Sequence, residues 1–348
     1  MSVTSSVLSV TPPASPSSSP RSSSLVGITL HLPSSSLRLV SVLGRGAYGT
    51  VYLGKSLSNA SLYAVKHLPH PHTYQHRYQQ EVRIHTACHH HPNIVHVHHV
   101  VQVNQASSVQ GWFMVMEYAN QGDLFDFITR PNGLSALPNA ASIASSLFAQ
   151  LCSAVQHVHA QGFAHRDLKC ENILLHQASP SAPLLIKLAD FGLASPTTPH
   201  QSCTDRGCGS DFYMAPESHA SSRVPYNPLA ADIWSLGIIL ANLACGKNPW
   251  SKAAFSDPRF HAYVMGQLPL RDTVMRGITL GMERIILQLL SVDARQRPSI
   301  HQLVHLWSLV DISIWGNHVG MDQPPQSSAK SCRIPSNPSS FLTTPLKT

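Results

Sequence analysis

Two short segments constrain this chain of 348 residues more than any other feature: residues 165–172, which read HRDLKCEN, and the triplet DFG that begins at Asp190. Asp167 offers a carboxylate that can accept or orient the proton of a hydroxyl group, and Lys169 places a positive charge beside it. Asn172 and Asp190 carry the oxygen ligands that Mg²⁺ prefers. A fold that uses these groups together must bring two loops to one place.

The two segments resemble the catalytic loop and the metal-binding turn of eukaryotic protein kinases, and Lys169 is typical of the serine/threonine type. The resemblance covers nearly all of residues 37–310. Residues 246–252 and 256–263 are similar to those of fungal serine/threonine kinases that govern meiotic entry and nutrient responses. The resemblance implies that the γ-phosphate of ATP is transferred to Ser or Thr hydroxyls of protein substrates, with ATP and Mg²⁺ as cofactors.

The order of the predicted elements agrees with that fold. Strand-type runs at residues 39–43, 50–53 and 62–66 come first, and helical periodicity follows at 74–88, 143–159 and 230–244. We therefore expect an α+β, two-lobed protein kinase fold, with a small antiparallel β-sheet and one key helix in the N-lobe and a larger, mainly helical C-lobe. The predicted domains are a disordered Ser/Pro-rich leader (1–36), a kinase domain (37–319; N-lobe 37–117, C-lobe 118–319) and a disordered tail (320–348).

Three glycines, Gly44, Gly46 and Gly49, form the pattern of a hairpin that folds closely over phosphate groups. A glycine-rich hairpin that binds no ligand would show the same pattern. Phosphate binding is the favoured interpretation because Lys66 ends an apolar strand and could hold the α and β phosphates. Glu81, on the following helix, is its predicted ion-pair partner.

The resemblance implies further nucleotide contacts. The adenine ring would lie between apolar side chains, the backbone of residues 117–119 would bind its edge, and Met116 would guard the back of the pocket. His165 would have a packing role, in a column with Phe191, Val97 and His85. The remaining predicted ATP-binding residues are Leu43, Val51, Ala64, Glu117, Ala119 and Leu174.

The segment that starts at Asp190 is expected to control activity and to bind the protein substrate. Ser210 stands where serine/threonine kinases place a hydroxyl that bonds the catalytic groups, and Arg166 implies an activating anion. Arg206 occupies the position at which many relatives carry a phosphothreonine. Our hypothesis is that Asp205, or phosphorylated Thr204, supplies the negative charge instead.

Four other residues are expected to support the substrate platform or to select the substrate. Glu217 should pair with Arg297, and Asp232 should bond the backbone of the catalytic loop. Glu171 and Asp123 occupy positions that meet arginines of the substrate in kinases that prefer basic sequences.

Composition limits the other functions. The net charge of +7 comes with only 12% charged residues, which does not support nucleic-acid binding. Seven scattered cysteines favour reduced thiols, and residues 233–245, the most apolar stretch, are too short to span a bilayer. We expect a monomer in the cytoplasm or nucleus that binds no membrane.

The 22 histidines include a run at residues 89–91 and others at 96, 98 and 99, which raises the question of a zinc site. The sequence shows no tetrahedral pattern among them, so compositional bias is the preferred interpretation. Two other functions would leave different marks in the sequence. A pseudokinase that acts as a binding module would be expected to lack Lys66, Asp167 or Asp190, and a small-molecule kinase would not need the peptide platform around Ser210.

Overall fold

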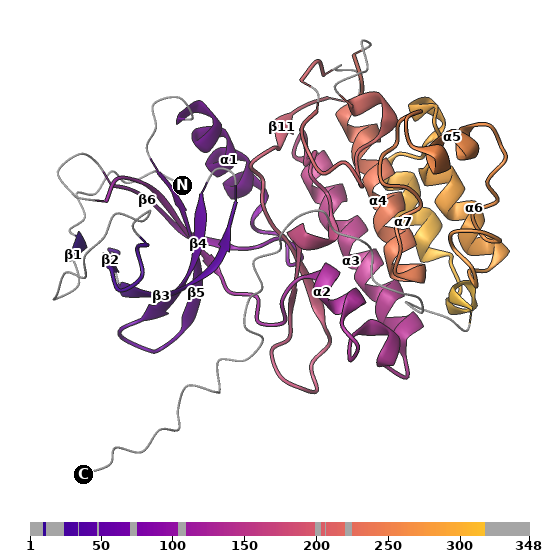
Figure 1. Cartoon of the computed structure of the whole chain (residues 1–348). Helices are drawn as coiled ribbons and strands as arrows, with labels where there is room; N and C mark the ends of the chain where they lie inside the picture. The colour runs from indigo at the N-terminus through magenta and orange to yellow at the C-terminus, as the bar shows by residue number, and fades with distance from the viewer. Residues whose placement is uncertain are drawn as a thin grey trace. The chain divides into compact units, whose positions relative to one another are not determined.

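The structure is a computed structural model of the chain, and Figure 1 shows the order of its elements. It divides into two compact units, of which unit 1 holds residues 1–70, 98–122 and 327–348 and unit 2 holds residues 71–97 and 123–326. The residues that the structure describes are 10–11, 24–33, 35–46, 49–69, 75–103, 109–198, 203–205, 207–219 and 225–316.

Unit 1 is built on an antiparallel sheet with the strand order β1-β2-β3-β4-β5-β7-β6. Buried Leu37 and Leu39 alternate with exposed Arg38 and Val40 along β3, as in a strand with one face in a core, whereas the first six residues of β7 are all buried. The strands are β1 (Val10–Thr11), β2 (Thr29–His31), β3 (Ser36–Arg45), β4 (Thr50–Ser56), β5 (Leu62–Leu68), β6 (Val97–Val103) and β7 (Gly111–Glu117).

The predicted leader of residues 1–36 is wrong over its last part. Strand β2 pairs with β3, with Leu30 opposite Leu37, and Leu25, Ile28 and Leu30 are buried in the core of unit 1. These apolar residues lie close together behind a long Ser/Pro-rich stretch, so the average composition of the leader concealed a short segment able to bury its side chains. The rest of the leader, apart from β1, and the predicted tail lie outside the described residues.

Unit 2 contains the helices and the loops that carry the catalytic motifs. Its α-helices are α1 (Gln75–Cys88), α2 (Leu124–Thr129), α3 (Ala140–Ala160), α4 (Pro228–Cys245), α5 (Pro258–Val264), α6 (Leu280–Leu289) and α7 (Ile300–Ser308). Its strands are β8 (Phe163–Ala164), β9 (Ile173–His176), β10 (Leu185–Leu188) and β11 (Ser195–Pro196). Short 3₁₀ helices are η2 (Leu134–Ala136), η3 (Cys170–Asn172), η4 (Pro216–Ser218), η5 (Ala294–Gln296) and η6 (Ile312–Trp315).

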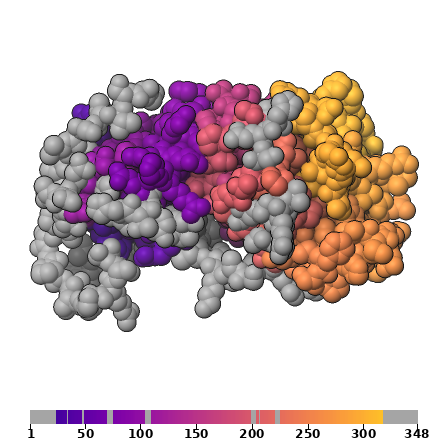
Figure 2. Space-filling view, turned by 90° about the horizontal axis from the view of Figure 1, so that it is seen from above, coloured from indigo at the N-terminus to yellow at the C-terminus, as the bar shows by residue number. Residues whose placement is uncertain are grey.

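Helix α4 is the central helix of unit 2. Asn227 caps its start by accepting hydrogen bonds from the amides of Leu229 and Ala230, and Gly246 ends it in the left-handed conformation. The helix is longer than the apolar stretch of residues 233–245, and its length and composition alone would allow it to cross a membrane, but 89% of it is buried inside the protein. The segments coloured orange and yellow, which include α5 to α7, adjoin one another in Figure 2.

The predicted helices and strands are confirmed, with shifted ends. Residues 177–183 form the tip of the hairpin between β9 and β10. Before β6, which begins at Val97, Ile94 forms an isolated bridge to Leu188.

Candidate active site

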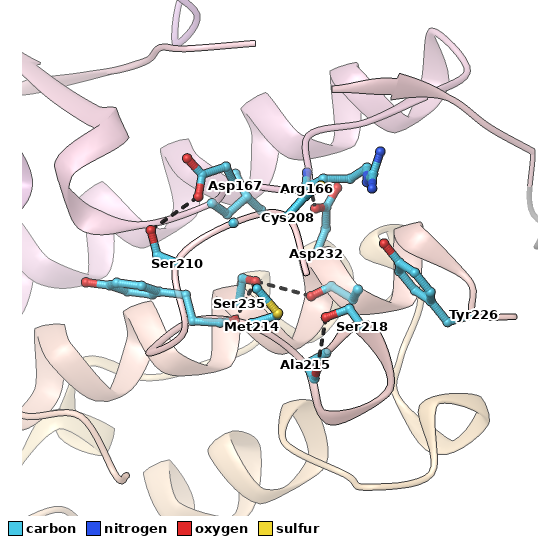
Figure 3. Close-up of a pocket in the computed structure, with 14 residues that line it drawn as sticks. Arg166, Asp167, Cys208, Ser210, Met214, Ala215, Ser218, Tyr226, Asp232 and Ser235 are labelled. Atoms are coloured by element: carbon cyan, nitrogen blue, oxygen red, sulfur yellow. Dashed lines mark hydrogen bonds between the residues drawn. The ribbon is translucent and has the colours of Figure 1, made fainter. Parts of the chain in front are cut away.

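Asp167 lies at the centre of the catalytic loop, and its carboxylate is held by three side chains of unit 2. Lys169 Nζ donates to Asp167 Oδ2 at 2.6 Å, and Asn172 Nδ2 donates to the same oxygen at 3.1 Å. Ser210 Oγ donates to Asp167 Oδ1 at 3.4 Å, and Figure 3 shows this hydroxyl pointing toward the carboxylate. Asp167 is 9% exposed, so the protein fixes the orientation of the carboxylate that the sequence singled out.

The backbone of this loop is strained, and Asp232 holds it in place. Arg166 has φ of 67°, a left-handed conformation that costs a non-glycine residue roughly 1–3 kcal/mol. Asp232 opposes that cost because its two carboxylate oxygens accept hydrogen bonds from the amides of His165 and Arg166, each at 2.9 Å. Burial alone would raise the pKa of Asp232, but hydrogen bonds from His159 and from the amide of Arg166 help to lower it. The predicted role of Asp232 is confirmed.

A column of rings lies beneath the DFG turn. Phe191 is fully buried, and its ring centroid is 5.0 Å from that of His165, edge-on, and 4.7 Å from that of His85, stacked. Burial lowers the pKa of His165, and its Nε2 donates to the carbonyl of Ala189 at 3.2 Å. His165 is therefore a neutral packing residue, as predicted, and α1 reaches the turn through His85.

Two side chains are suited to hold a divalent metal ion. The amide nitrogen of Asn172 donates to the Asp167 backbone carbonyl at 2.9 Å as well as to its carboxylate, which leaves the Asn172 amide oxygen as a metal ligand. Asp190 is exposed and has φ of 63°, a second strained position at the site. A Cβ at Gly192 would lie 3.3 Å from a carboxylate oxygen of Glu81, so Glu81 on α1 borders the same turn.

The glycine-rich hairpin of unit 1 joins β3 to β4, and its three glycines serve different needs. A Cβ at Gly49 would lie 2.4 Å from the carbonyl oxygen of His67, so Gly49 is required for the approach of β5. A Cβ at Gly44 would meet no atom within 4 Å, and one at Gly46 would meet only the carbonyl oxygen of Gly49, at 3.8 Å. None of the three glycines has a positive φ. Gly44 and Gly46 therefore differ from Gly49 in the open space beside them, not in their backbone conformation.

Four predicted nucleotide-binding residues share one face of the sheet of unit 1. Val51 lies opposite Lys66, and Ala64 lies opposite Met116, and residues opposite each other in antiparallel strands point to the same face. The intervening residues, such as Val65, point to the other face and form the core of the unit. The strand register thus places Lys66 on the face that carries the predicted adenine contacts.

The other predicted nucleotide contacts are partly exposed. Leu43 is the extra residue of a bulge between the paired residues Val42 and Gly44, and Glu117 and Ala119 lie at and just beyond the end of β7. In unit 2, Leu174 is half-exposed because the side chains on either side of it in β9 face the core. The Lys66–Glu81 pair would join residues of different units and stays a prediction.

Asp205 provides an anion for Arg166 within the activation segment. Nη2 of Arg166 donates to the Asp205 carboxylate at 3.0 Å and to its backbone carbonyl at 2.7 Å. Arg166 is 7% exposed, whereas Asp205 is 61% exposed. Thr204 is exposed beside this pair, and Arg206 lies outside the described residues. The geometry favours the Asp205 version of the hypothesis.

The substrate platform is fastened by the predicted ion pair. Arg297 donates to both carboxylate oxygens of Glu217, at 2.6 and 2.8 Å, and also to the carbonyls of Ala230 and Ser291. The guanidinium also lies 4.9 Å from the ring centroid of Trp234. The Arg297 side chain is completely buried, so the predicted pair is confirmed as a buried ion pair. Breaking a pair of this kind from one side is strongly destabilising.

Sequence reasoning missed several supporting contacts. The Tyr226 hydroxyl donates a hydrogen bond to the Asp205 carbonyl at 3.1 Å, and His159 Nε2 is hydrogen-bonded to the Asp232 carboxylate at 2.9 Å. Gln80 on α1 donates to the Ala194 carbonyl at 2.7 Å. Each contact joins segments far apart in the chain, and no motif within either segment could have signalled it.

Comparison with known proteins agrees with this geometry. The model of the protein kinase domain matches residues 37–307, and the chain therefore belongs to the protein kinase family. It is 37% identical over 253 residues (66% of this chain, 51% of the relative) to the "Negative regulator of sexual conjugation and meiosis" of Schizosaccharomyces pombe. It is 35% identical over 243 residues (66% and 48%) to the serine/threonine-protein kinase ksp1 of that organism.

A third relative, the serine/threonine-protein kinase chk1 of the same yeast, is 32% identical over 276 residues (76% of this chain, 52% of the relative). The kinase domain is thus of the serine/threonine type, and such a domain implies ATP as substrate together with a divalent metal ion. The chain spans about half the length of these relatives.

Proposed function

We propose that the protein transfers the γ-phosphate of ATP to Ser and Thr hydroxyls of protein substrates, with Mg²⁺ as the metal ion. The observation that carries the proposal is the Asp167 carboxylate, held at once by Lys169, Asn172 and Ser210. A packing or scaffold role would not require this convergence. Lys66 and Asp190 are also present, which argues against a pseudokinase.

In the proposed reaction, the oxygen of the substrate hydroxyl bonds to the γ-phosphorus and the bond from that phosphorus to the bridging β,γ-oxygen breaks. Asp167 orients the hydroxyl and accepts its proton, and Lys169 offsets negative charge on the phosphoryl group. Bound Mg²⁺ would supply positive charge to the phosphates, and Asn172 and Asp190 would hold it. In unit 1, Gly44 and Gly46 leave room for phosphate oxygens.

Remaining nucleotide contacts are proposed on the same basis. Lys66 would bind the α and β phosphates and pair with Glu81, and Met116 would border the adenine. The other adenine contacts would come from Leu43, Val51, Ala64, Glu117, Ala119 and Leu174. Gly49 would maintain the hairpin rather than touch the nucleotide, because it is already needed against His67.

We further propose that the Asp205 carboxylate is the activating anion of Arg166, in place of a phosphate group. A fixed carboxylate at 3.0 Å from Arg166 stabilises the segment before Ser210 without any modification. The Asp205 side chain is largely exposed, so the ion pair is screened and its effect on activity should be modest.

Substrates with arginines before the phosphoacceptor are the proposed class. Asp123 and Glu171 each have a raised pKa, mainly because of desolvation; the carboxylates of Asp126 and Glu171 add to the effect at Asp123, and that of Asp167 adds to it at Glu171. An arginine guanidinium would relieve this clustering of negative charge. A positional peptide library tests the idea, and a lack of preference for Arg before Ser or Thr would contradict it.

The central experiment is a transfer assay with labelled ATP, Mg²⁺ and a generic protein substrate. We expect label on Ser and Thr with the wild type and none above background with Asp190→Asn. Lack of transfer by the wild type would contradict the enzyme proposal, and transfer to metabolites but not to proteins would contradict the substrate class.

The cellular setting is proposed from the thiols. None of the six cysteines among the described residues belongs to a disulfide, which suits the reducing cytoplasm or nucleus. Imaging of a fluorescent fusion would test this location. Light scattering would test the proposal that the protein acts as a monomer.

A further inference from the structure

Three histidines meet where α1 ends and β6 begins. His89 and His90 directly follow the last residue of α1, and His96 directly precedes the first residue of β6. One ring nitrogen from each lies within 4.8 Å of the others. His89 is buried, His96 is half-buried and His90 is exposed, so the cluster runs from the interior of unit 2 to its surface.

Hydrogen bonds fix two of these rings. The backbone carbonyl of His89 can only accept, so His96 Nδ1, at 3.4 Å, must be its donor, and the neutral His96 ring then carries its lone pair on Nε2. A backbone carbonyl that binds the second nitrogen is the usual support for a metal-ligating histidine. His89 Nδ1 accepts from the amide of Val97 at 3.2 Å, so neutral His89 carries its proton on Nε2. To bind a metal ion it must give up the bond to Val97, either because Nδ1 becomes the ligand or because the proton moves from Nε2 to Nδ1.

The spacing is close to that of a metal site. Tetrahedral Zn²⁺ with Zn–N bonds of about 2.0–2.1 Å places ligand nitrogens about 3.3 Å apart, so the three rings need to close by about 1.5 Å at most. The exposed ring of His90 is on the side from which an ion would enter. Neutral imidazoles select Zn²⁺, Co²⁺, Ni²⁺ and Cu²⁺ over Mg²⁺, so such a site would not compete for the ion that the proposed reaction uses.

We propose that His89, His90 and His96 form a binding site for one divalent transition-metal ion, with Zn²⁺ as the best-fitting ion and water as a fourth ligand. The site goes beyond phosphoryl transfer, and it replaces the sequence-based interpretation of these histidines as compositional bias. The position of the site suggests that metal binding would affect α1. The ion would tie the end of α1 to the start of β6, and α1 contacts the DFG turn through His85 and Phe191.

Zn²⁺ binding by the full chain, prepared without a polyhistidine tag, tests the proposal directly. Calorimetry should find one Zn²⁺ bound more tightly than the rest. His90→Ala and His96→Ala should each weaken that step by more than about tenfold, a loss at least as large as that from removing a metal's supporting residue. His98→Ala is the matched control, because His98 is exposed, belongs to the same histidine-rich segment and lies outside the cluster. It should bind like the wild type.

Two further readouts separate loss of the site from loss of folding. His90 is exposed, so His90→Ala should unfold at the wild-type temperature without metal and should lose the rise in that temperature caused by Zn²⁺. Zn²⁺ should also slow amide hydrogen exchange at residues 89–97 of the wild type. Equal Zn²⁺ affinity in the wild type and in both cluster variants, or an equal loss in His98→Ala, would overturn the proposal.

Discussion

Replacing Arg297 by alanine is the change that most sharply tests our account of stability. Arg297 is completely buried, donates to both oxygens of Glu217 and binds two backbone carbonyls from separate segments. The substitution leaves the Glu217 carboxylate, itself only 20% exposed, without its partner. Breaking a buried pair from one side costs about 3–5 kcal/mol, because the remaining charge stays desolvated.

A second arginine in the same segment provides the control. Arg295, two residues earlier, pairs with Asp293 at 2.9 Å, but its side chain is 90% exposed. Water can replace that interaction, so Arg295→Ala should unfold close to the wild type. Arg297→Lys should fall between wild type and Arg297→Ala, because an ammonium group keeps the charge but cannot bind the carboxylate with the same two-pronged geometry.

Urea unfolding followed by circular dichroism measures the difference. A loss of about 3–5 kcal/mol lowers the ratio of folded to unfolded protein by roughly two to four powers of ten, which moves the urea midpoint clearly. If Arg297→Ala and Arg295→Ala unfolded at the same urea concentration, burial would not govern the strength of these pairs and the reasoning would be refuted.

Three other predictions concern the activation segment, the pH dependence and the hairpin. Asp205→Asn should lower the transfer rate about two- to fivefold, the range for a partly exposed ion pair, whereas Thr204→Ala should keep full rate; the reverse order would show that phosphorylation supplies the charge. Asp123 has its pKa raised to about 6, mainly by burial, so the folded state holds its proton more tightly than the unfolded state does. Stability should therefore fall by at most about 3 kcal/mol as pH rises from about 4 to about 6, and Asp123→Asn should remove that part of the fall in pH-dependent unfolding. Gly49→Ala should lower the free energy of unfolding by about 1–3 kcal/mol, because its Cβ meets a carbonyl oxygen, and Gly46→Ala should leave it within about 0.5 kcal/mol in thermal melts; equal losses would contradict the assigned roles.

The sequence was sufficient where chemistry ties residues to a short motif. Asp167, Lys169 and Asn172 lie within six consecutive residues, so the chain itself fixes their proximity. The Glu217–Arg297 pair was predictable for another reason: both positions belong to motifs of a family whose fold brings them together. Periodicity gave the helices because α3 and α4 are long and bury a continuous set of side chains.

Features formed by tertiary contact were beyond the sequence. In strand β2 only Leu30 is buried, opposite Leu37 of β3, and a composition average cannot reveal a contact of this kind. The histidine cluster unites residues on both sides of a turn, and its distances depend on how that turn folds. The bond between Tyr226 and Asp205 likewise depends on the pairing of Cys203 with Tyr226.

The central claim, that Asp167 carries out phosphoryl transfer, is tested most directly by comparing binding and chemistry in one variant. Asp167→Asn keeps the size of the side chain but loses the negative charge that would accept the hydroxyl proton. We predict that its ATP affinity, measured by calorimetry, stays near the wild-type value while the rate of transfer to Ser or Thr falls by roughly 10²–10⁴-fold. Transfer by Asp167→Asn at the wild-type rate would contradict the account.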